Sequence, residues 1–345
     1  MQQRELKGSG PLLNPDGTLA DLGWARQPML DCNLEDCRVY DWLRFWQPMR
    51  IKRWDYYAVT TPDHFFSFTV SDIGYLGSIF AYAIDFASGD YHEETLTIPL
   101  ARGVTLPRNS TAGQSCFDNG QVRLDFHAHA DRRTLSVRWP GFYNGDFNAE
   151  LTLEQPPEHE SLVIVIPIRG RRFYYNRKIN CLRTHGQVSY GGKSYEMDPQ
   201  TCLGSLDWGR GVWEYRSFWV WASASGFLPD GRQMGLNLGY GFGDTSQASE
   251  NCIILDGIIH KLGEVKFTYS SQNYKAPWTM KSDDGRLDLE FTPFFERNAR
   301  TDLKLLGSEV HQMFGRYRGT AVSAAGERLE IHDLIGWAEE HHAKW

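Results

Sequence analysis

Short segments in which apolar and polar residues alternate recur along most of this sequence. Residues 121–127 and 135–139 place an apolar side chain at every second position, which is the period of a strand with one buried face. Residues 65–70, 148–153 and 161–168 are further strand-like segments, rich in aromatic or aliphatic side chains. This pattern predicts an all-β chain built from antiparallel sheets that form a barrel or a sandwich.

Dipeptides that suit tight turns separate the strand-like segments. Asn-Gly and Asp-Gly favour hairpins because both residues tolerate a positive φ. The turn dipeptides lie at residues 16–17, 119–120, 144–145, 191–192, 230–231, 256–257, 284–285 and 325–326. Helical patterns are few. Residues 35–45 predict one turn-rich helix, and residues 329–342 predict a strand that runs into a short C-terminal helix.

The chain length predicts more than one domain. A chain of 345 residues is long enough for about two domains of ordinary size. The polar segment 196–203 contains Pro199 and precedes the densest aromatic stretch, so we place a boundary there. The expected domains are residues 1–198 and 199–345, both β-rich.

Composition and charge exclude several classes of protein. Aromatic residues make up 14% and apolar residues 41% of the chain, which excludes a disordered or low-complexity protein. A formal charge of −7 argues against a broad phosphate-binding surface, so no nucleic-acid partner is expected. The sequence has neither an apolar run of membrane-spanning length nor an apolar signal core at residues 1–11. We therefore expect a soluble, cytoplasmic protein, whose oligomeric state the sequence leaves open.

Cysteine and histidine spacing gives no support for a metal or a cofactor. The six cysteines include no CxxC pair, and we expect them to be reduced and mostly buried. The eleven histidines are scattered without HxH or HExxH spacing. We therefore expect no bound metal and no cofactor, and a small molecule as the ligand.

The first candidate binding segment is residues 173–180. Asn176, Lys178 and Asn180 would share one face of a strand, because side chains alternate along it. Facing a solvated lumen, they would offer an ammonium group and two amides to a ligand. The alternative is that this face is the exposed outer side of a sheet.

The second candidate segment is residues 204–226, where tryptophans are concentrated. Asp207 among indoles would be desolvated, which raises the pKa of a carboxyl and suits a general acid. Indole faces would also stabilise a developing cation. The alternative for Asp207 is a structural ion pair with Arg210 or Arg216. The other candidate binding residues of this segment are Trp208, Arg210, Trp213, Tyr215, Arg216, Trp219 and Trp221.

Two further residues are candidates for proton transfer. Glu250 follows a segment in which Gly239, Gly241 and Gly243 alternate with aromatic residues, and it is the second candidate carboxylate; a cap or turn role is its alternative. His311 is the best placed histidine for proton transfer, with a hydrogen-bonded structural role as its alternative.

Several stretches together resemble the domain-of-unknown-function family 2804. They are GWARQPMLDCN at residues 23–33, YYNRKINC at 174–181, LDWGRGVWEYRSFWVWASASG at 206–226, GLNLGYGFGD at 235–244 with ENCIILDG at 250–257, and GWAEEHH at 336–342. This resemblance extends over nearly the whole chain and implies no established activity.

More distantly, the layout resembles the carotenoid hydratase and fungal pericyclase group. The shared elements are an Asp-Trp-Gly turn at residues 207–209, a Trp-x-Trp strand at 219–221 and a hairpin at 230–231. The resemblance implies two lipocalin-like β domains with a pocket, and an acidic residue that protonates an alkene, a role that falls on Asp207. The segment YNRKIN is more polar than a hydrocarbon channel needs, which indicates a polar or oxygenated ligand.

Three functions are compatible with these features. The first is an enzyme of the hydratase, lyase or isomerase type with Asp207 as general acid, which acts on a small, partly apolar, oxygenated molecule. The second is a non-catalytic protein that binds a lipid or another small molecule in the same aromatic pocket. The third is a carbohydrate-active protein, in which Asp207 and Glu250 form a carboxylate pair.

Overall fold

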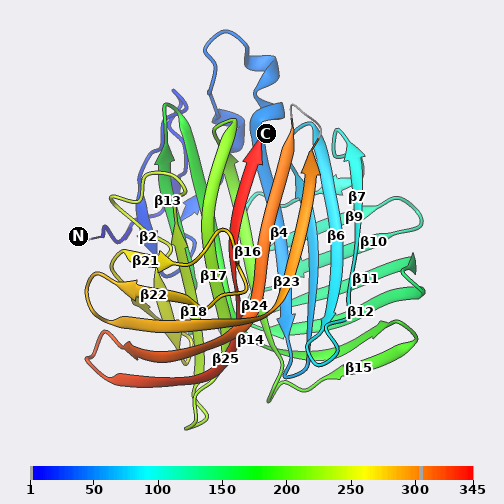
Figure 1. The fold of residues 1–345 in the computed structure, drawn as a ribbon. Coiled ribbons are helices and arrows are strands. Elements are labelled where there is room, and N and C mark those ends of the chain that lie inside the picture. Colours follow the sequence, from blue (N-terminus) through cyan, green and yellow to red (C-terminus); the bar gives the residue numbers. More distant parts are fainter. Residues whose placement is uncertain (1–2, 303–305, 345) are drawn as a thin grey trace.

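The computed structural model describes residues 3–302 and 306–344, and nearly all of its regular structure is strand (Figure 1). The predicted all-β class is confirmed: two curled antiparallel sheets account for most of the chain. No helix within these described residues has both the length and the apolar character that crossing a bilayer requires.

The larger sheet contains 14 strands in the described residues, in the order β7-β6-β5-β4-β16-β14-β12-β11-β10-β9-β8, with β13, β15 and β2 attached beside this path. Their bounds are β2 Gly23–Ala25, β4 Ile51–Thr60, β5 His64–Asp72, β6 Leu76–Asp85, β7 Tyr91–Pro99, β8 Val104–Thr105, β9 Gly113–Asp118, β10 Arg123–Ala128, β11 Arg132–Phe142, β12 Gly145–Glu154, β13 Leu162–Ile168, β14 Arg172–Tyr190, β15 Lys193–Met197 and β16 Leu203–Val212.

The second sheet contains 9 strands in the described residues, in the order β20-β19-β18-β17-β25-β24-β23-β22-β21. Their bounds are β17 Arg216–Phe227, β18 Gln233–Tyr240, β19 Cys252–Leu255, β20 Ile258–Lys261, β21 Val265–Thr268, β22 Trp278–Ser282, β23 Leu287–Asp302, β24 Gly307–Val322 and β25 Arg328–Lys344. A small parallel pair joins β1 Gly10–Pro11 to β3 Leu30–Asp31.

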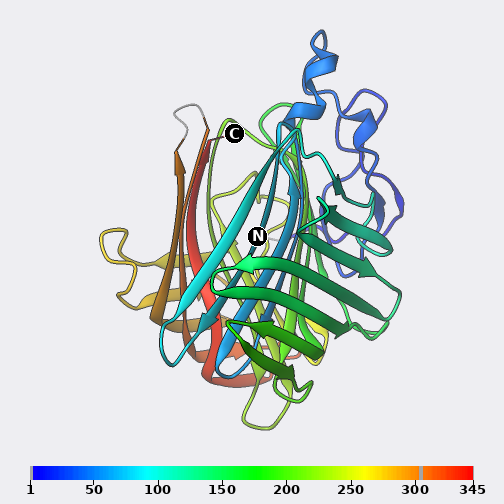
Figure 2. The ribbon, with the colours of Figure 1, turned by 90° about the vertical axis from the view of Figure 1, so that its right-hand side faces the viewer.

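One layer of strands, which includes β4, β5 and β6, lies between the second sheet and strands β9–β12 of its own sheet (Figure 2). Alternate side chains of β4 therefore enter different cores. Tyr57 packs in the cluster that contains Phe126 and Leu135, whereas Ala58 packs in the cluster that contains Trp337 of the second sheet. Residues 65–71 of β5 are therefore all buried, whichever face of the strand they leave.

The long strand β14 contributes to two parts of the larger sheet. Its first half pairs with β13 and β16, and its second half pairs with β12 and β15. The change occurs at a bulge, where the pairing with β16 shifts between Ile179 and Leu182, and Cys181 adopts a φ of 61°. The bulge bends the strand, as extra residues in a ladder do.

The strand predicted at the start of residues 329–342 is present, but the helix predicted after it is wrong, and so is the single helix predicted at residues 35–45. Residues 329–342 lie within β25, which pairs with β24 on one side and β17 on the other, so tertiary pairing outweighs the local helical pattern. Residues 35–45 do not form one helix. Short 3₁₀ helices occupy Leu34–Asp36, Arg44–Trp46 and Pro48–Arg50, and the segment between the first two is irregular.

The chain passes from the first sheet to the second between Val212 and Arg216, because β16 pairs with β4 and β14 whereas β17 pairs with β18 and β25. A domain boundary between residues 198 and 199 stays a prediction. The predicted free cysteines are confirmed: all six are free, Cys116 is half-buried and the other five are buried.

Gly209 on β16 makes room for the indole of Trp54 on the neighbouring strand β4. The two residues are register partners, and a Cβ atom at position 209 would lie 1.9 Å from Cζ2 of Trp54. Any larger residue at position 209 must therefore displace this indole.

We expect Gly209→Ala to lower the free energy of unfolding by about 1–3 kcal/mol, because overpacking a filled site forces its neighbours to move. Chemical denaturation measures the loss. Gly145→Ala on β12 is the matched control, since Gly145 lies in a strand and a Cβ atom there meets nothing within 4 Å. Equal stability of the two variants would show that the indole moves without cost.

Candidate functional site

A cavity of about 390 Å³ lies between the two sheets. Its walls come from β4–β7, β14 and β16 on one side and from β17, β18 and β23–β25 on the other. Aromatic side chains form much of the lining, namely Trp54, Tyr56, Tyr75, Phe80, Tyr174, Trp213, Trp219, Trp221, Tyr240 and Phe242. The size and the apolar character are those of a small-molecule site.

The strand register arranges residues of the cavity wall in two rows, one on each sheet, and both rows include charged and polar groups. In the first sheet, consecutive register partners line the cavity from β14 to β7: Lys178, Asp207, Tyr56, Thr69, Phe80 and Thr95. In the second sheet, a row runs from β18 to β23: Gly239, Trp221, Glu339, Gln312 and Arg297. Directly opposed side chains in a sheet share one face, so each row presents its groups to the same space.

The ammonium group of Lys178 makes one of the contacts between the two rows. Its Nζ lies 2.9 Å from Oδ2 of Asp207, 3.9 Å from Oε2 of Glu250 and 4.0 Å from the ring centroid of Trp221. Lys178 is only 4% exposed. Buried charges need partners of opposite sign, and the two carboxylates and the indole face supply them.

Asp207 is held by donors on both of its oxygens. Oδ1 accepts a hydrogen bond of 2.6 Å from Nδ2 of Asn176, and Oδ2 faces Lys178. Asn176 is itself fully buried and also donates to the carbonyl of Trp208. Asn176 therefore positions Asp207, and Asp207 in turn positions Lys178.

Glu250 reaches the cavity because Gly239 has no side chain. A Cβ atom at position 239 would lie 3.1 Å from Oε2 of Glu250, so the glycine leaves the space that the carboxyl occupies. Burial raises the pKa of Glu250, Lys178 opposes this shift, and the charge of Asp207 adds to it. Burial and the nearby Glu250 also raise the pKa of Tyr174, so its phenol stays protonated beside this group.

Glu339 is a further carboxyl of the cavity, which the sequence analysis missed. Its Oε1 accepts a hydrogen bond of 3.1 Å from Nε1 of Trp219, and no hydrogen bond from the described residues reaches Oε2. Burial raises the pKa of Glu339 to about 7. Around neutral pH this carboxyl therefore exists in both protonation states, as a proton-transfer group requires.

His341 lies next to Trp219, with ring centroids 4.0 Å apart, and lines the cavity. Burial and the charge of Arg297 lower the pKa of His341 to about 3, so its imidazole is neutral. Glu339 and His341 share one face of β25. Alternation of residues 336–342 would have revealed this face, had the segment been interpreted as a strand.

The structure brings six of the predicted site residues to the cavity and places the others elsewhere. Lys178, Asp207, Trp213, Trp219, Trp221 and Glu250 line it. Asn176 lies directly behind Asp207. Asn180 instead joins the two sheets, since its amide donates to Oγ of Ser223 and the carbonyl of Ala224.

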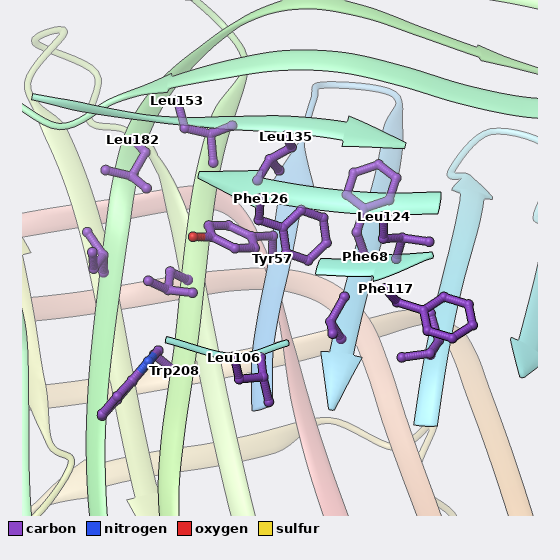
Figure 3. Packing of buried hydrophobic residues seen from close by; sticks show 14 of the residues in the cluster. Tyr57, Phe68, Leu106, Phe117, Leu124, Phe126, Leu135, Leu153, Leu182 and Trp208 are labelled. Atoms are coloured by element: carbon purple, nitrogen blue, oxygen red, sulfur yellow. The ribbon is translucent and has the colours of Figure 1, made fainter. Parts of the chain in front are cut away.

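Trp208 and Arg210 lie on the opposite side of β16 from the cavity. Trp208 packs in the core of the larger sheet with Tyr57 and Leu106 (Figure 3). Arg210 is fully buried, lies over the Trp208 ring at 4.2 Å and pairs with Asp55 at 2.9 Å. Both residues stabilise the fold beneath the cavity.

Tyr215, Arg216 and His311 also lie outside the cavity lining. Tyr215 is 43% exposed and Arg216 is exposed as well. His311 pairs with Glu296 at 2.9 Å and stacks on Tyr274, and both line a separate polar cavity with it. His311 precedes Gln312 on β24, so its side chain leaves the opposite face of that strand.

Two curled antiparallel sheets with an aromatic, charged cavity between them define a two-part lipocalin-like protein. The chain belongs to the family described as Domain of unknown function (DUF2804), whose model matches residues 3–345. The predicted family is thereby confirmed. Comparison with curated protein sequences gives no match.

Solved structures with a similar fold include CghA in complex with Sch210972, at 11% sequence identity and a TM-score of 0.55, covering 86% of this chain and 89% of that one. The kievitone hydratase from Nectria haematococca has 11% identity and a TM-score of 0.45, covering 85% of this chain and 88% of that one. The expected distant likeness to the carotenoid hydratase and fungal pericyclase group is confirmed at the level of the fold.

We expect Lys178→Met to lower the free energy of unfolding at pH 8 by about 3–5 kcal/mol, because removing one partner leaves buried carboxylates without a counter-ion. The loss should shrink at pH 5. Without the ammonium group the pKa of Glu250 rises further above its unfolded value, so the folded state binds more protons and is favoured as pH falls. Denaturation at both pH values measures this. Lys178→Met with Asp207→Asn should recover part of the loss, and an equal loss at both pH values would contradict this account.

We expect Glu339→Gln to become more stable relative to the unmodified protein as pH rises from 5 to 8. The folded pKa of Glu339 lies at about 7, above that of an exposed glutamate. Its ionisation therefore destabilises the folded state, with the cost absent at low pH and complete above the folded pKa. The gain should be on the order of 2–3 kcal/mol, since one pKa unit corresponds to about 1.4 kcal/mol. Thermal melts across this range measure the gain. Glu196→Gln, at an exposed position of β15, is the control, and its stability relative to the unmodified protein should not change with pH.

Proposed function

We propose that this protein is an enzyme of the hydratase, lyase or isomerase type, which acts on a small, partly apolar, oxygenated molecule held between the two sheets. The observation that carries the proposal is the position of Glu339. Its carboxyl is buried against the Trp219 indole, has one oxygen without a donor from the described residues, and shares the cavity with the charged group Lys178–Asp207–Glu250.

In this proposal the protonated carboxyl of Glu339 donates its proton to a double bond of the substrate, and the electron pair of that bond forms the new C–H bond. In a conjugated ketone, the carbonyl group polarises the double bond, so the proton adds to the α-carbon and the β-carbon is the electron-deficient one. In a hydration, water adds to that carbon and its proton returns to Glu339. In an isomerisation, a neighbouring C–H bond supplies both the returning proton and the electrons of the new double bond.

Asp207 as the general acid stays a prediction, and its contacts favour a positioning role instead. Both of its oxygens are occupied by donors, Asn176 and Lys178, so neither presents a proton to the cavity. The fixed negative charge of Asp207 adds to the rise in the pKa of Glu339. We assign the proton transfer to Glu339. The role of Asp207 is to raise the pKa of Glu339 through its charge and to position Lys178.

The carbohydrate-active alternative is disfavoured by the same contacts. A glycosidase needs one carboxyl as acid and a second as nucleophile or base. Here Asp207 and Glu250 both face the Lys178 ammonium group, at 2.9 and 3.9 Å, so their charge is directed to this cation rather than to a sugar ring. A non-catalytic binding protein is the alternative that the experiment must distinguish from an enzyme.

Incubation of the purified protein in D₂O with neutral conjugated ketones, namely trans-chalcone, 4-phenyl-3-buten-2-one and β-ionone, tests the proposal. We expect mass spectrometry to detect incorporated solvent deuterium or added water above an enzyme-free blank. Glu339→Gln should lower this rate by about 100-fold or more, the usual contribution of a general acid. The rate should fall above pH 7, where Glu339 loses its proton.

Other outcomes separate the alternatives. If Asp207→Asn abolishes turnover while Glu339→Gln retains it, Asp207 is the acid and our assignment is wrong. If every ketone is recovered unchanged although it binds, the protein is a binding protein and the enzymatic proposal fails.

A further inference from the structure

A second polar cluster lies in the same cavity, at the β23 end of the second-sheet row. Arg297 is 8% exposed and donates from Nε and Nη2 to the two oxygens of Glu93, each at 2.8 Å. Glu93 lies on β7 and Arg297 on β23, so this ion pair joins the two sheets. The Arg297 guanidinium also lies 4.5 Å from the ring centroid of Tyr82.

The amide of Gln312 has a fixed orientation in this cluster. Its Oε1 accepts from the Tyr82 hydroxyl at 3.0 Å and, more weakly, from Nη1 of Arg297 at 3.5 Å. Tyr82 receives a hydrogen bond from Tyr56 in turn, at 2.9 Å. Because Arg297 has no acceptor, the amide oxygen must face it, and the amide nitrogen points the other way.

The nitrogen of Gln312 is left with hydrogens to donate. Gln312 is 2% exposed and lines the cavity, and its Nε2 makes no hydrogen bond to the described residues. On the facing wall, Oγ1 of Thr69 is also buried in the cavity lining and has no partner there. Buried polar groups in folded proteins are normally satisfied, and a ligand in this cavity can pair with both of these groups.

The charge of the cluster restricts that ligand. Arg297 is neutralised by Glu93, and Lys178 by Asp207 and Glu250, so neither cation is free to bind an anion. Glu339 adds a further carboxyl to the lining. A carboxylate ligand would therefore be repelled, whereas a neutral oxygen that accepts hydrogen bonds matches the donors of Gln312.

We infer that Gln312 binds a neutral carbonyl oxygen of the substrate and determines specificity for conjugated carbonyl compounds. Gln312 and Glu339 are register partners on β24 and β25, so their backbones are about 5 Å apart. A carbonyl at Gln312 thus lies a few bonds from a carbon that Glu339 reaches, which is the geometry of an unsaturated ketone. This inference rests on the proposed function for the role of Glu339, but not for the binding of the carbonyl.

Binding of three matched probes tests the inference without any turnover. The probes are trans-chalcone, a neutral conjugated ketone, trans-stilbene, which has the two rings but no oxygen, and trans-cinnamate, which is anionic. Quenching of tryptophan fluorescence reports occupation, because Trp54, Trp213, Trp219 and Trp221 line the cavity. We expect chalcone to bind at least 10-fold more tightly than stilbene, and cinnamate to bind more weakly than chalcone.

Variants of the cavity wall distinguish a loss of carbonyl recognition from a loss of folding. Gln312→Met should reduce the preference for chalcone over stilbene to less than 3-fold while stilbene affinity changes little. Gln121→Met is the matched control, since Gln121 is exposed and should leave the preference intact. A thermal melt verifies that each variant is folded. If Gln312→Met does not fold, Thr69→Val is the second variant, and it should weaken chalcone binding more than stilbene binding.

The inference is overturned if chalcone and stilbene bind equally to the unmodified protein, if cinnamate binds as well as chalcone, or if no ketone binds. It is also overturned if Gln312→Met keeps the preference. A chalcone preference that depends on Gln312, together with no deuterium incorporation, would support the recognition site and contradict the proposed enzymatic function.

Discussion

The burial of the Lys178 ammonium group between two sheets is the interaction on which the site depends. This lysine leaves β14 of one sheet and contacts the Trp221 indole and Glu250, which both belong to the other part of the chain. A buried cation is tolerated only when its partners are fixed, and Asn176, Asn237 and Gly239 provide this. Asn176 orients Asp207, Asn237 accepts from the Trp221 indole at 2.7 Å, and Gly239 leaves space for Glu250.

The two polar clusters of the cavity differ in how completely they are satisfied. Lys178 and Asp207 form an ion pair. In contrast, three residues keep an oxygen or a nitrogen without a partner among the described residues, namely Glu339, Gln312 and Thr69. An unsatisfied buried group destabilises a fold, so these three groups are the ones in the cavity lining that a ligand can satisfy. The fully paired ions instead hold the walls in place.

Alternation along single strands predicted much of the fold and part of the site. The period of two is a local property, so the sequence correctly predicts which residues share a face within one strand. Examples are the polar residues of 176–180 and the tryptophans at 219 and 221. Glu339 was missed since its segment looked helical, and Arg297 and Gln312 were missed since their partners, Glu93 and Tyr82, lie some 200 residues away in sequence. Trp208, Arg210 and His311 show the remaining difficulty. Alternation separates the two faces of a strand, but it does not say which face adjoins the cavity when both are buried.

In the central layer, the alternation of side chains divides the sequence of a strand into two independent sets of positions. In β4 and β16 one set packs against strands β9–β12 and the other set faces the cavity. Substitutions at every second residue can thus reshape the cavity while the core packing on the far side stays as it is. A family with this arrangement has the means to acquire new ligands one side chain at a time, with the same scaffold beneath them.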